Sequence, residues 1–247
     1  MKNYSIIIPV YNEANILKSQ IRRIVAGLNK LNLPVDYEIL LVENGSRDNT
    51  RKLIGQLLKR YKNIRRICLP FPSYGQAFKE GIKKAKYSYI FQFDIDFWQV
   101  AFIRKAQTLL EDYDFVIGSK NLNGSKDNRS FFRRSISRLI EKIIEFHFNT
   151  ELTDTHGIKA LKKSVIGNLI ADVKCSNHFF DSELLLRAAA LGHSFAEVPV
   201  SLKEIRASRF PFYLRFGEVI KEFLLLMKVQ LQKEKHLSLS YKFQATN

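Results

Sequence analysis

The sequence has little of what disulfide-rich, zinc-binding and membrane-spanning proteins need. Its two cysteines, Cys68 and Cys175, are too few for a disulfide framework and too far apart for a zinc motif, as expected in a reducing compartment. The five histidines show no metal-ligand spacing. No segment reaches the roughly 18 to 20 apolar residues that span a bilayer, because Lys228 interrupts the apolar run near the C-terminus. We therefore expect a cytoplasmic chain that does not cross a membrane.

A secretory signal is also missing. Pro9 and Asn12 interrupt the first apolar run, so we expect residues 4–11 to form a strand of the fold.

Negative charge is scarce. The 247 residues contain 24 Asp and Glu against 40 Lys and Arg, which gives a net charge of +16 and favours anionic partners. Nucleic acid, phosphorylated substrates and acidic membranes all qualify, but the sequence has no zinc-finger spacing, no RNP-type motif and no basic zipper. We expect no nucleic-acid partner. The hydrophobic content of 46% is that of a folded globular protein.

Strand and helix patterns alternate through the first hundred residues. Alternating βαβ units predict a parallel sheet covered by helices, with ligands bound beyond the carboxyl ends of the strands. Three polar clusters, at residues 9–13, 43–46 and 94–96, follow strand ends and should meet at one edge. The predicted strands are 4–11, 37–46, 64–70 and 89–94, and the predicted helices are 13–31, 49–61, 74–86 and one from about residue 100.

Asp94 and Asp96 end the buried strand pattern "YIFQFDID". Two carboxylates this close raise each other's cost unless a cation or a hydrogen-bond network holds them. Mg²⁺ and Mn²⁺ prefer oxygen ligands and often combine carboxylates with substrate phosphates. The alternative is that both aspartates cap the helix that begins near Val100.

Seven motifs occur in the order in which a known family of enzymes has them. The segments "PVYNE", "VENGSRDNT", "YGQAFKEGIKKAK", "FDID", "VIGSK", "DTHGIKALKK" and "FDSELLLRAAALGHSFAEVPV" resemble the family 2 glycosyltransferases, most closely the branch with dolichyl-phosphate mannose synthases and bacterial polyprenyl-phosphate glycosyltransferases. The resemblance spans about Tyr4 to Arg209. It implies an α/β, Rossmann-like GT-A fold with a mostly parallel sheet and helices on both faces. Residues 1–210 would form the catalytic domain, including an amphipathic interface helix at about 130–148, and residues 211–247 a C-terminal amphipathic helix and tail.

The resemblance also assigns donor and metal residues. Asp94 and Asp96 match the catalytic Asp-x-Asp motif, which binds Mg²⁺ or Mn²⁺, and Asp94 also approaches the donor. Relatives carry a Gln two residues after the second Asp, where this chain has Trp98, so Gln99 or a water would complete the metal site. The remaining donor-binding residues implied for a UDP- or GDP-sugar are Pro9, Tyr11, Glu13, Glu43, Asn44, Gln76 and, in a loop that closes over the donor, Arg209.

Two kinds of acceptor fit the resemblance. A lipid phosphate is already ionised and needs no protein base, and Lys120, Arg133 and Ser137 match its binding positions. A sugar hydroxyl would need a base, for which Asp181 and Glu183 stand at the matching acidic position. The alternative for Glu183 is an ion pair with Arg187 one helical turn away.

The segment "NRSFFRRSISRLIEKIIEFHF" bears on this choice. It predicts a basic amphipathic helix, which either lies in an anionic membrane interface or packs as an ordinary helix with a solvated face. Its cationic row is Arg134, Arg138 and Lys142, and its apolar positions are Phe132, Ile136, Leu139, Ile140, Ile143 and Ile144.

The sequence therefore predicts a metal-dependent, inverting glycosyltransferase that moves a sugar from a nucleotide-diphosphate donor to a polyprenyl phosphate. We expect it to be peripheral at the inner, cytoplasmic face of an anionic membrane. The first alternative is a family 2 transferase that acts on a hydroxyl of a polysaccharide or lipid-linked glycan. The second is a catalytically silent membrane scaffold that binds nucleotide sugars.

Overall fold

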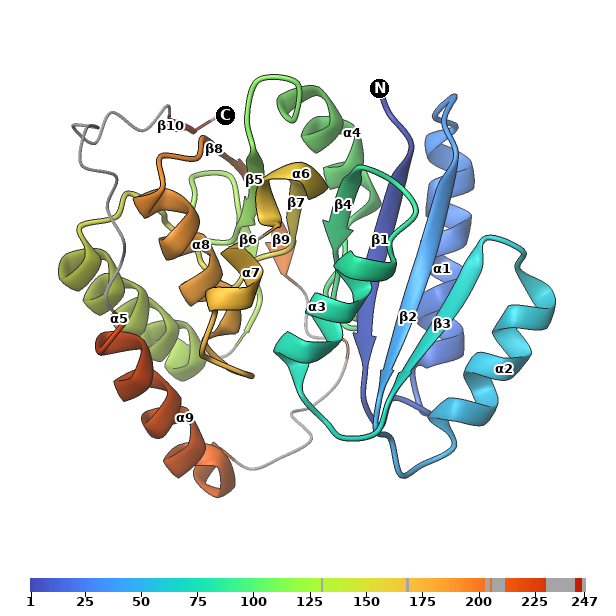
Figure 1. Ribbon diagram of the computed structural model, residues 1–247, viewed down its shortest axis with the longest axis horizontal. Coiled ribbons are helices and arrows are strands. Elements are labelled where there is room, and N and C mark those ends of the chain that lie inside the picture. The colour runs from blue at the N-terminus through green and yellow to red at the C-terminus, as the bar shows by residue number, and fades with distance from the viewer. Residues whose placement is uncertain (130, 168, 203–204, 206–211, 230–242, 246–247) are drawn as a thin grey trace.

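The computed structural model describes residues 1–129, 131–167, 169–202, 205, 212–229 and 243–245. Within these residues the chain forms an eight-stranded sheet in the order β10-β8-β5-β7-β4-β1-β2-β3, with helices on both faces (Figure 1). All neighbouring strands are parallel except where β7 pairs with β4 and β5. The predicted GT-A organisation is confirmed.

The first half of the chain follows the predicted alternation of strand and helix. Its elements are β1 (Tyr4–Val10), α1 (Leu17–Leu31), β2 (Tyr37–Asn44), α2 (Thr50–Arg60), β3 (Ile64–Leu69), α3 (Tyr74–Lys84), β4 (Tyr89–Gln92) and α4 (Val100–Leu109).

The second half adds the antiparallel strand and the amphipathic helices. Its elements are β5 (Phe115–Ser119), β6 (Lys126–Asp127), α5 (Phe131–Phe148), β7 (Lys159–Lys162), α6 (Lys163–Ile166), α7 (Leu169–Asp172), α8 (Phe180–Ala190), β8 (Phe195–Pro199), β9 (Ser201–Leu202), α9 (Phe212–Met227) and β10 (Phe243–Ala245). The short strands β6 and β9 pair with each other outside the main sheet.

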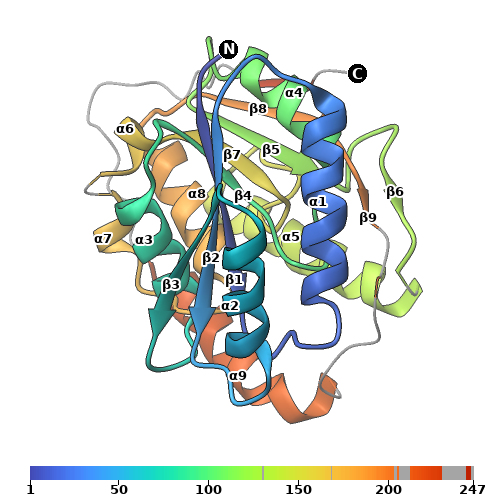
Figure 2. The ribbon, with the colours of Figure 1, turned by 90° about the vertical axis from the view of Figure 1, so that its right-hand side faces the viewer.

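The sheet is buried on both faces because its strands are apolar at successive positions. On β1, Ile6 and Ile8 face a core with α1, α2 and α4, whereas Ile7 faces a second core with α3 and α8. Figure 2 shows the sheet between these two helical layers. Beyond both cores, the carboxyl ends of the parallel strands are followed by loops.

Helices α5 and α9 lie beside α8, away from the sheet, and α5 has the predicted bounds to within a residue (Figure 1). They share a third, smaller apolar cluster with α8 that includes Ile144, Phe179 and Leu226. The C-terminal helix ends at Met227 and is shorter than its amphipathic pattern, which continues into residues outside the described part. The strand β10, which pairs with β8, was not predicted. No helix among the described residues is both long and apolar enough to span a membrane.

Candidate active site

The loops after β1 and β2 are joined at the sheet edge. Val10 pairs with Glu43 in the parallel register, so both strands end at the same level. Asn12 takes a positive φ of 51° and accepts a hydrogen bond from the Arg47 amide, while its own amide donates to Ser46 Oγ. These contacts bring the predicted donor residues of the first two loops together.

Glu13 and Glu43 are both buried in this pair of loops. The Glu13 amide donates to Thr50 Oγ1 at 2.8 Å, where helix α2 begins. Glu43 accepts from the Ser46 amide and from Arg51 Nε, each at 2.5 Å. Arg51 compensates the charge of Glu43, so this carboxylate stabilises the turn after β2.

The turn after β2 needs glycine. Gly45 has φ of 74°, and a Cβ there would lie 3.0 Å from the backbone of Phe71. Asn44, next to it, accepts from the Ser73 amide and so ties the β3–α3 loop to the same edge. Gln76 is exposed on α3, and its side-chain Nε2 donates to Glu80 Oε1 at 3.5 Å.

Asp94 and Asp96 occupy a tight turn directly after β4. The amide of Asp94 donates to the Phe97 carbonyl and the amide of Phe97 donates to the Asp94 carbonyl. The alternative, capping of the next helix, is wrong for both aspartates, because the N-cap of α4 is Gln99. Both aspartates lie instead in the turn at the edge of the sheet.

Several carboxylates gather near Asp94 at this edge. Burial, together with the charges of Asp96 and Asp181, raises the pKa of Asp94 to about 7, and Glu13 adds to the effect. Clustered carboxylates that resist ionisation in one another's presence fit a hard divalent cation. Asp94 and Asp96 are the residues that would hold it.

Gln99 is turned toward β9. Its amide nitrogen donates to the Ser201 carbonyl at 2.8 Å, so only the amide oxygen is available to a cation. Trp98 donates from its indole Nε1 to Gln20 Oε1 on α1 at 3.2 Å. Gln99 as a metal ligand stays a prediction.

Asp181 lies in a buried polar network with side chains of α3, β4 and β7. It accepts from Tyr74 Oη at 3.0 Å, from Gln92 Nε2 at 3.2 Å and from Lys159 Nζ at 2.9 Å. Tyr74 also accepts a hydrogen bond from Gln92. Three donors therefore surround the Asp181 carboxylate, which is a candidate base for a hydroxyl acceptor.

Glu183 is fully buried on α8. Its carboxylate forms an ion pair with Arg187 at 2.7 Å and accepts hydrogen bonds from the amides of Lys174 and Cys175. The expected i,i+4 ion pair is thus present, inside the protein rather than on its surface. These contacts favour the structural interpretation of Glu183 over the general base.

The candidate acceptor residues lie on α5 or follow β5. Lys120 is buried and its ammonium lies 2.6 Å from Asp154 Oδ1. Ser137 accepts from Arg129 Nη1 at 3.3 Å. Arg133 belongs to α5, but its side chain lies outside the described residues, as does all of Arg209.

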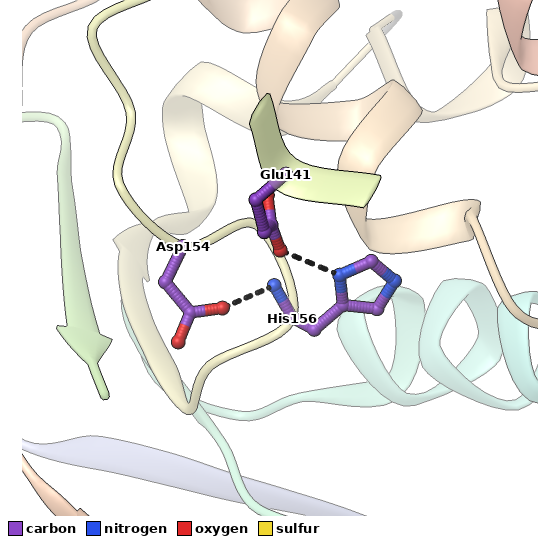
Figure 3. A group of neighbouring side chains, drawn as sticks. All are labelled: Glu141, Asp154 and His156. Atoms are coloured by element: carbon purple, nitrogen blue, oxygen red, sulfur yellow. Dashed lines mark hydrogen bonds and ion pairs between the residues drawn. The ribbon is translucent and has the colours of Figure 1, made fainter. Parts of the chain in front are cut away.

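Glu141 of α5 forms a second cluster with Asp154 and His156, which precede β7 (Figure 3). The ring of His156 faces Glu141 with Nδ1 at 3.1 Å and the His178 carbonyl with Nε2 at 2.9 Å. Burial lowers the pKa of His156, but the hydrogen bond to Glu141 and the charges of Glu141 and Asp154 together outweigh it, so the pKa is raised. Lys120 forms an ion pair with Asp154, and His156 joins Glu141 of α5 to the segment before β7, so the cluster fastens α5 to the domain.

Sequence reasoning missed Lys159, Asp154 and Glu141. Asp154 and Lys159 stand in the segment "DTHGIKALKK", which served only as a motif of the resemblance. Glu141 interrupts the apolar stripe of α5, and a single acidic residue at such a position was the available signal for a buried partner.

Comparisons with known proteins agree with this geometry. The family model described as "Glycosyl transferase family 2" matches residues 5–169. The chain is 28% identical over 225 residues to "Dolichyl-phosphate beta-glucosyltransferase" of Dictyostelium discoideum, covering 84% of this chain and 69% of that protein. It is 27% identical over 209 residues to "Glycosyltransferase AglD" of Haloferax volcanii, covering 79% of this chain but only 32% of that protein.

Among solved structures, the chain is similar to glucosyl-3-phosphoglycerate synthase from Mycobacterium tuberculosis. The complex of that enzyme with Mn²⁺, UDP and glucosyl-3-phosphoglycerate has a TM-score of 0.63 at 18% identity, covering 92% of this chain and 81% of the other. Its complex with Mg²⁺ and UDP gives the same TM-score of 0.63 at 18% identity. At this identity the likeness establishes the shared fold.

The family model covers both the donor loops and the acidic turn, and the fold is the one that these enzymes share. The chain therefore belongs to glycosyl transferase family 2 and is a glycosyltransferase.

Proposed function

We propose that this glycosyltransferase moves a sugar from a UDP- or GDP-linked donor to a polyprenyl phosphate at the inner face of a membrane. The observation that carries the acceptor assignment is the exposed apolar and cationic surface of α5, next to the buried acceptor candidate Lys120. The dolichyl-phosphate glucosyltransferase named above supports the same acceptor class.

The donor would bind across the loops after β1, β2 and β4. Pro9, Tyr11, Glu13, Glu43 and Asn44 would hold the nucleoside, and Asp94 would meet the ribose or the metal. A divalent cation, Mg²⁺ or Mn²⁺, supplies charge neutralisation for the diphosphate leaving group when bound at Asp94 and Asp96. Structural neighbours that bind UDP with either ion support this assignment.

The transfer is a single displacement at the anomeric carbon. The bond from that carbon to the diphosphate oxygen breaks as a bond to an acceptor phosphate oxygen forms, which inverts the configuration. The acceptor oxygen is already ionised, so no proton has to move to a side chain. Lys120, Arg133 and Ser137 would orient the acceptor phosphate.

The engaged state of the acidic candidates supports the phosphate acceptor over the hydroxyl. A hydroxyl acceptor needs a base with a free lone pair near the sugar. Asp181 is surrounded by three donors, and Glu183 is paired with Arg187 and two amides.

Contact with a membrane would involve both amphipathic helices. On α5, Leu139, Ile143 and Phe146 are exposed at i, i+4 and i+7, with Phe146 91% exposed. Exposed Arg138 and Lys142 flank them. Exposed apolar side chains between cations on an amphipathic helix suit an anionic lipid interface.

Helix α9 extends this surface. It lies beside α5, where His147 Nε2 is 3.1 Å from the Met227 carbonyl, and it exposes Ile220, Leu224 and Leu225. We propose that residues 1–210 are the catalytic domain and that α9, in the C-terminal segment 211–247, adds to its membrane-facing side.

A donor and acceptor screen tests the proposal. Purified protein with Mn²⁺ or Mg²⁺ is offered a panel of UDP- and GDP-sugars, and released nucleoside diphosphate is measured with and without a short polyprenyl phosphate. We expect release to rise at least tenfold with the lipid phosphate for one donor. A rise with a glycan acceptor instead would favour the hydroxyl alternative, and no release in any combination would favour the silent scaffold.

A further inference from the structure

Lys159 is a fully buried cation in the middle of the sheet, and the transfer described above does not use it. It opens β7, the antiparallel strand between β4 and β5. In the register of these strands its partners are Gln92 on β4 and Ile117 on β5. Lys159 therefore stands beside a residue that lies two positions before Asp94.

The Lys159 ammonium has two close acceptors. It lies 2.9 Å from Asp181 Oδ2 on α8 and donates to the Gly157 carbonyl at 2.9 Å. The same Asp181 carboxylate receives Tyr74 of α3 and Gln92 of β4. The Asp181 carboxylate thus joins side chains of α3, β4 and β7 to α8, next to the strand that leads into the acidic turn.

Stability alone does not explain a buried pair of this kind. Removing an ammonium and a carboxylate from water costs several kcal/mol each, and well-packed apolar residues often serve stability as well or better. The position of the pair supplies another reason. Asp181 accepts a hydrogen bond from Gln92, the strand partner of Lys159, and Gln92 lies two residues before Asp94 on the segment that leads into the acidic turn.

We propose that Lys159 is a positioning residue of the metal site: its ammonium neutralises Asp181, so that this carboxylate can lie below the Asp94–Asp96 turn without displacing it. Lys159 acts through Asp181 and touches neither donor nor acceptor. The inference rests on the proposed metal-dependent function. It gives the segment "DTHGIKALKK" a specific role, because Lys159 in this segment provides one fixed positive charge near the acidic turn.

The test is binding of Mn²⁺ alone, titrated by electron paramagnetic resonance on the purified chain. Lys159→Met keeps the length of the side chain but leaves Asp181 uncompensated, and we expect the Kd for Mn²⁺ to rise at least tenfold. Lys159→Arg keeps the charge and should bind more tightly than Lys159→Met. The double variant Lys159→Met with Asp181→Asn removes both charges and should return to within threefold of wild type.

Lys163→Met is the matched control. Lys163 also donates to a backbone carbonyl, that of Ala85 at 2.8 Å, but it lies at the other end of β7. Its replacement should change the Kd for Mn²⁺ by less than twofold, which separates the charge at Lys159 from the general effect of removing a lysine.

Two results would overturn the proposal. One is wild-type Mn²⁺ affinity in Lys159→Met, and the other is a folded double variant that binds Mn²⁺ as weakly as the single variant. If Lys159→Met does not fold, the double variant decides by itself, because recovery of affinity requires only that both charges be absent. A wild-type chain that binds no Mn²⁺ either alone or with UDP would refute the metal-dependent function as well, whereas normal wild-type binding with unaffected variants refutes only the role of Lys159.

Discussion

The carboxylate of Glu222 lies 2.6 Å from the backbone nitrogen of His178, so a side chain of α9 binds the loop that leads into α8. The same carboxylate accepts from the amides of Ser176 and Asn177 at 3.2 and 2.9 Å. Loop amides have no partner in a helix or strand, so a carboxylate that accepts from several of them fixes the backbone of the loop. Helix α9 is thereby fastened to the loop before the helix that carries Asp181.

Replacing Glu222 should loosen this attachment. We expect Glu222→Ala to lower the free energy of unfolding by about 2 kcal/mol, because several amides lose their acceptor at once. Urea unfolding followed by circular dichroism measures the change. Lys221→Ala, at an exposed neighbouring position, is the control and should change stability by less than about 0.5 kcal/mol. An equal loss of stability in both variants would mean that the contact of Glu222 with the loop before α8 contributes nothing specific to stability.

Removing one acidic ligand should stop transfer without unfolding the chain. We expect Asp96→Asn to lower kcat at least about 100-fold, or about 3 kcal/mol of barrier, because the leaving group loses charge stabilisation. The assay is nucleoside diphosphate release, with thermal unfolding as the check on folding. Asp112→Asn, an exposed acid, should retain full activity. Full turnover of Asp96→Asn, or of wild type in excess EDTA, would remove the metal from the mechanism.

Metal affinity should depend on pH through Asp94. Burial and the neighbouring carboxylates raise the pKa of Asp94 to about 7, so below that pH a proton competes with the cation for this carboxylate. Affinity for Mn²⁺ should rise by up to about tenfold per pH unit as pH increases toward 7, and level off above it. Titrations between pH 5.5 and 8.5 measure this, and a flat profile would contradict a role for Asp94 as ligand.

Charge reversal on α5 should weaken membrane binding. Arg138 and Lys142 are exposed, and each cation near an anionic surface contributes about 1 kcal/mol, so Arg138→Glu with Lys142→Glu should reduce vesicle binding at least about 30-fold. Sedimentation with anionic liposomes across a salt series is the measurement, because salt screens this attraction.

The control for this variant changes net charge equally at a remote site. Lys59 and Arg60 are exposed at the end of α2, on the opposite side of the molecule from α5 (Figure 1). Lys59→Glu with Arg60→Glu should bind liposomes nearly as well as wild type. Equal losses in the two double variants would show that net charge, rather than the surface of α5, drives binding.

Local patterns in the sequence were sufficient for the elements and for the acidic turn. Apolar residues at successive strand positions and at helical spacing predicted β1 to β4 and their helices, because a side chain's face follows from the local period. The bounds of α5 followed from the same rule. Asp94 and Asp96 were found because polar residues at the end of a buried strand stand out from their neighbours.

Tertiary structure alone decided how the buried charges are paired. Lys159 and Asp181 are 22 positions apart, and Glu222 reaches amides more than 40 positions away, so no local period connects them. The ion pair of Glu183 with Arg187 was the alternative to a general base and was expected on a helix surface, but its burial depends on α8 lying between the sheet and the helices α5 and α9. Strand β10 likewise exists through its pairing with β8. The sequence by itself determined which elements form and where the acidic turn lies, since these follow from local periodicity, whereas only packing between distant segments decided which charges neutralise one another.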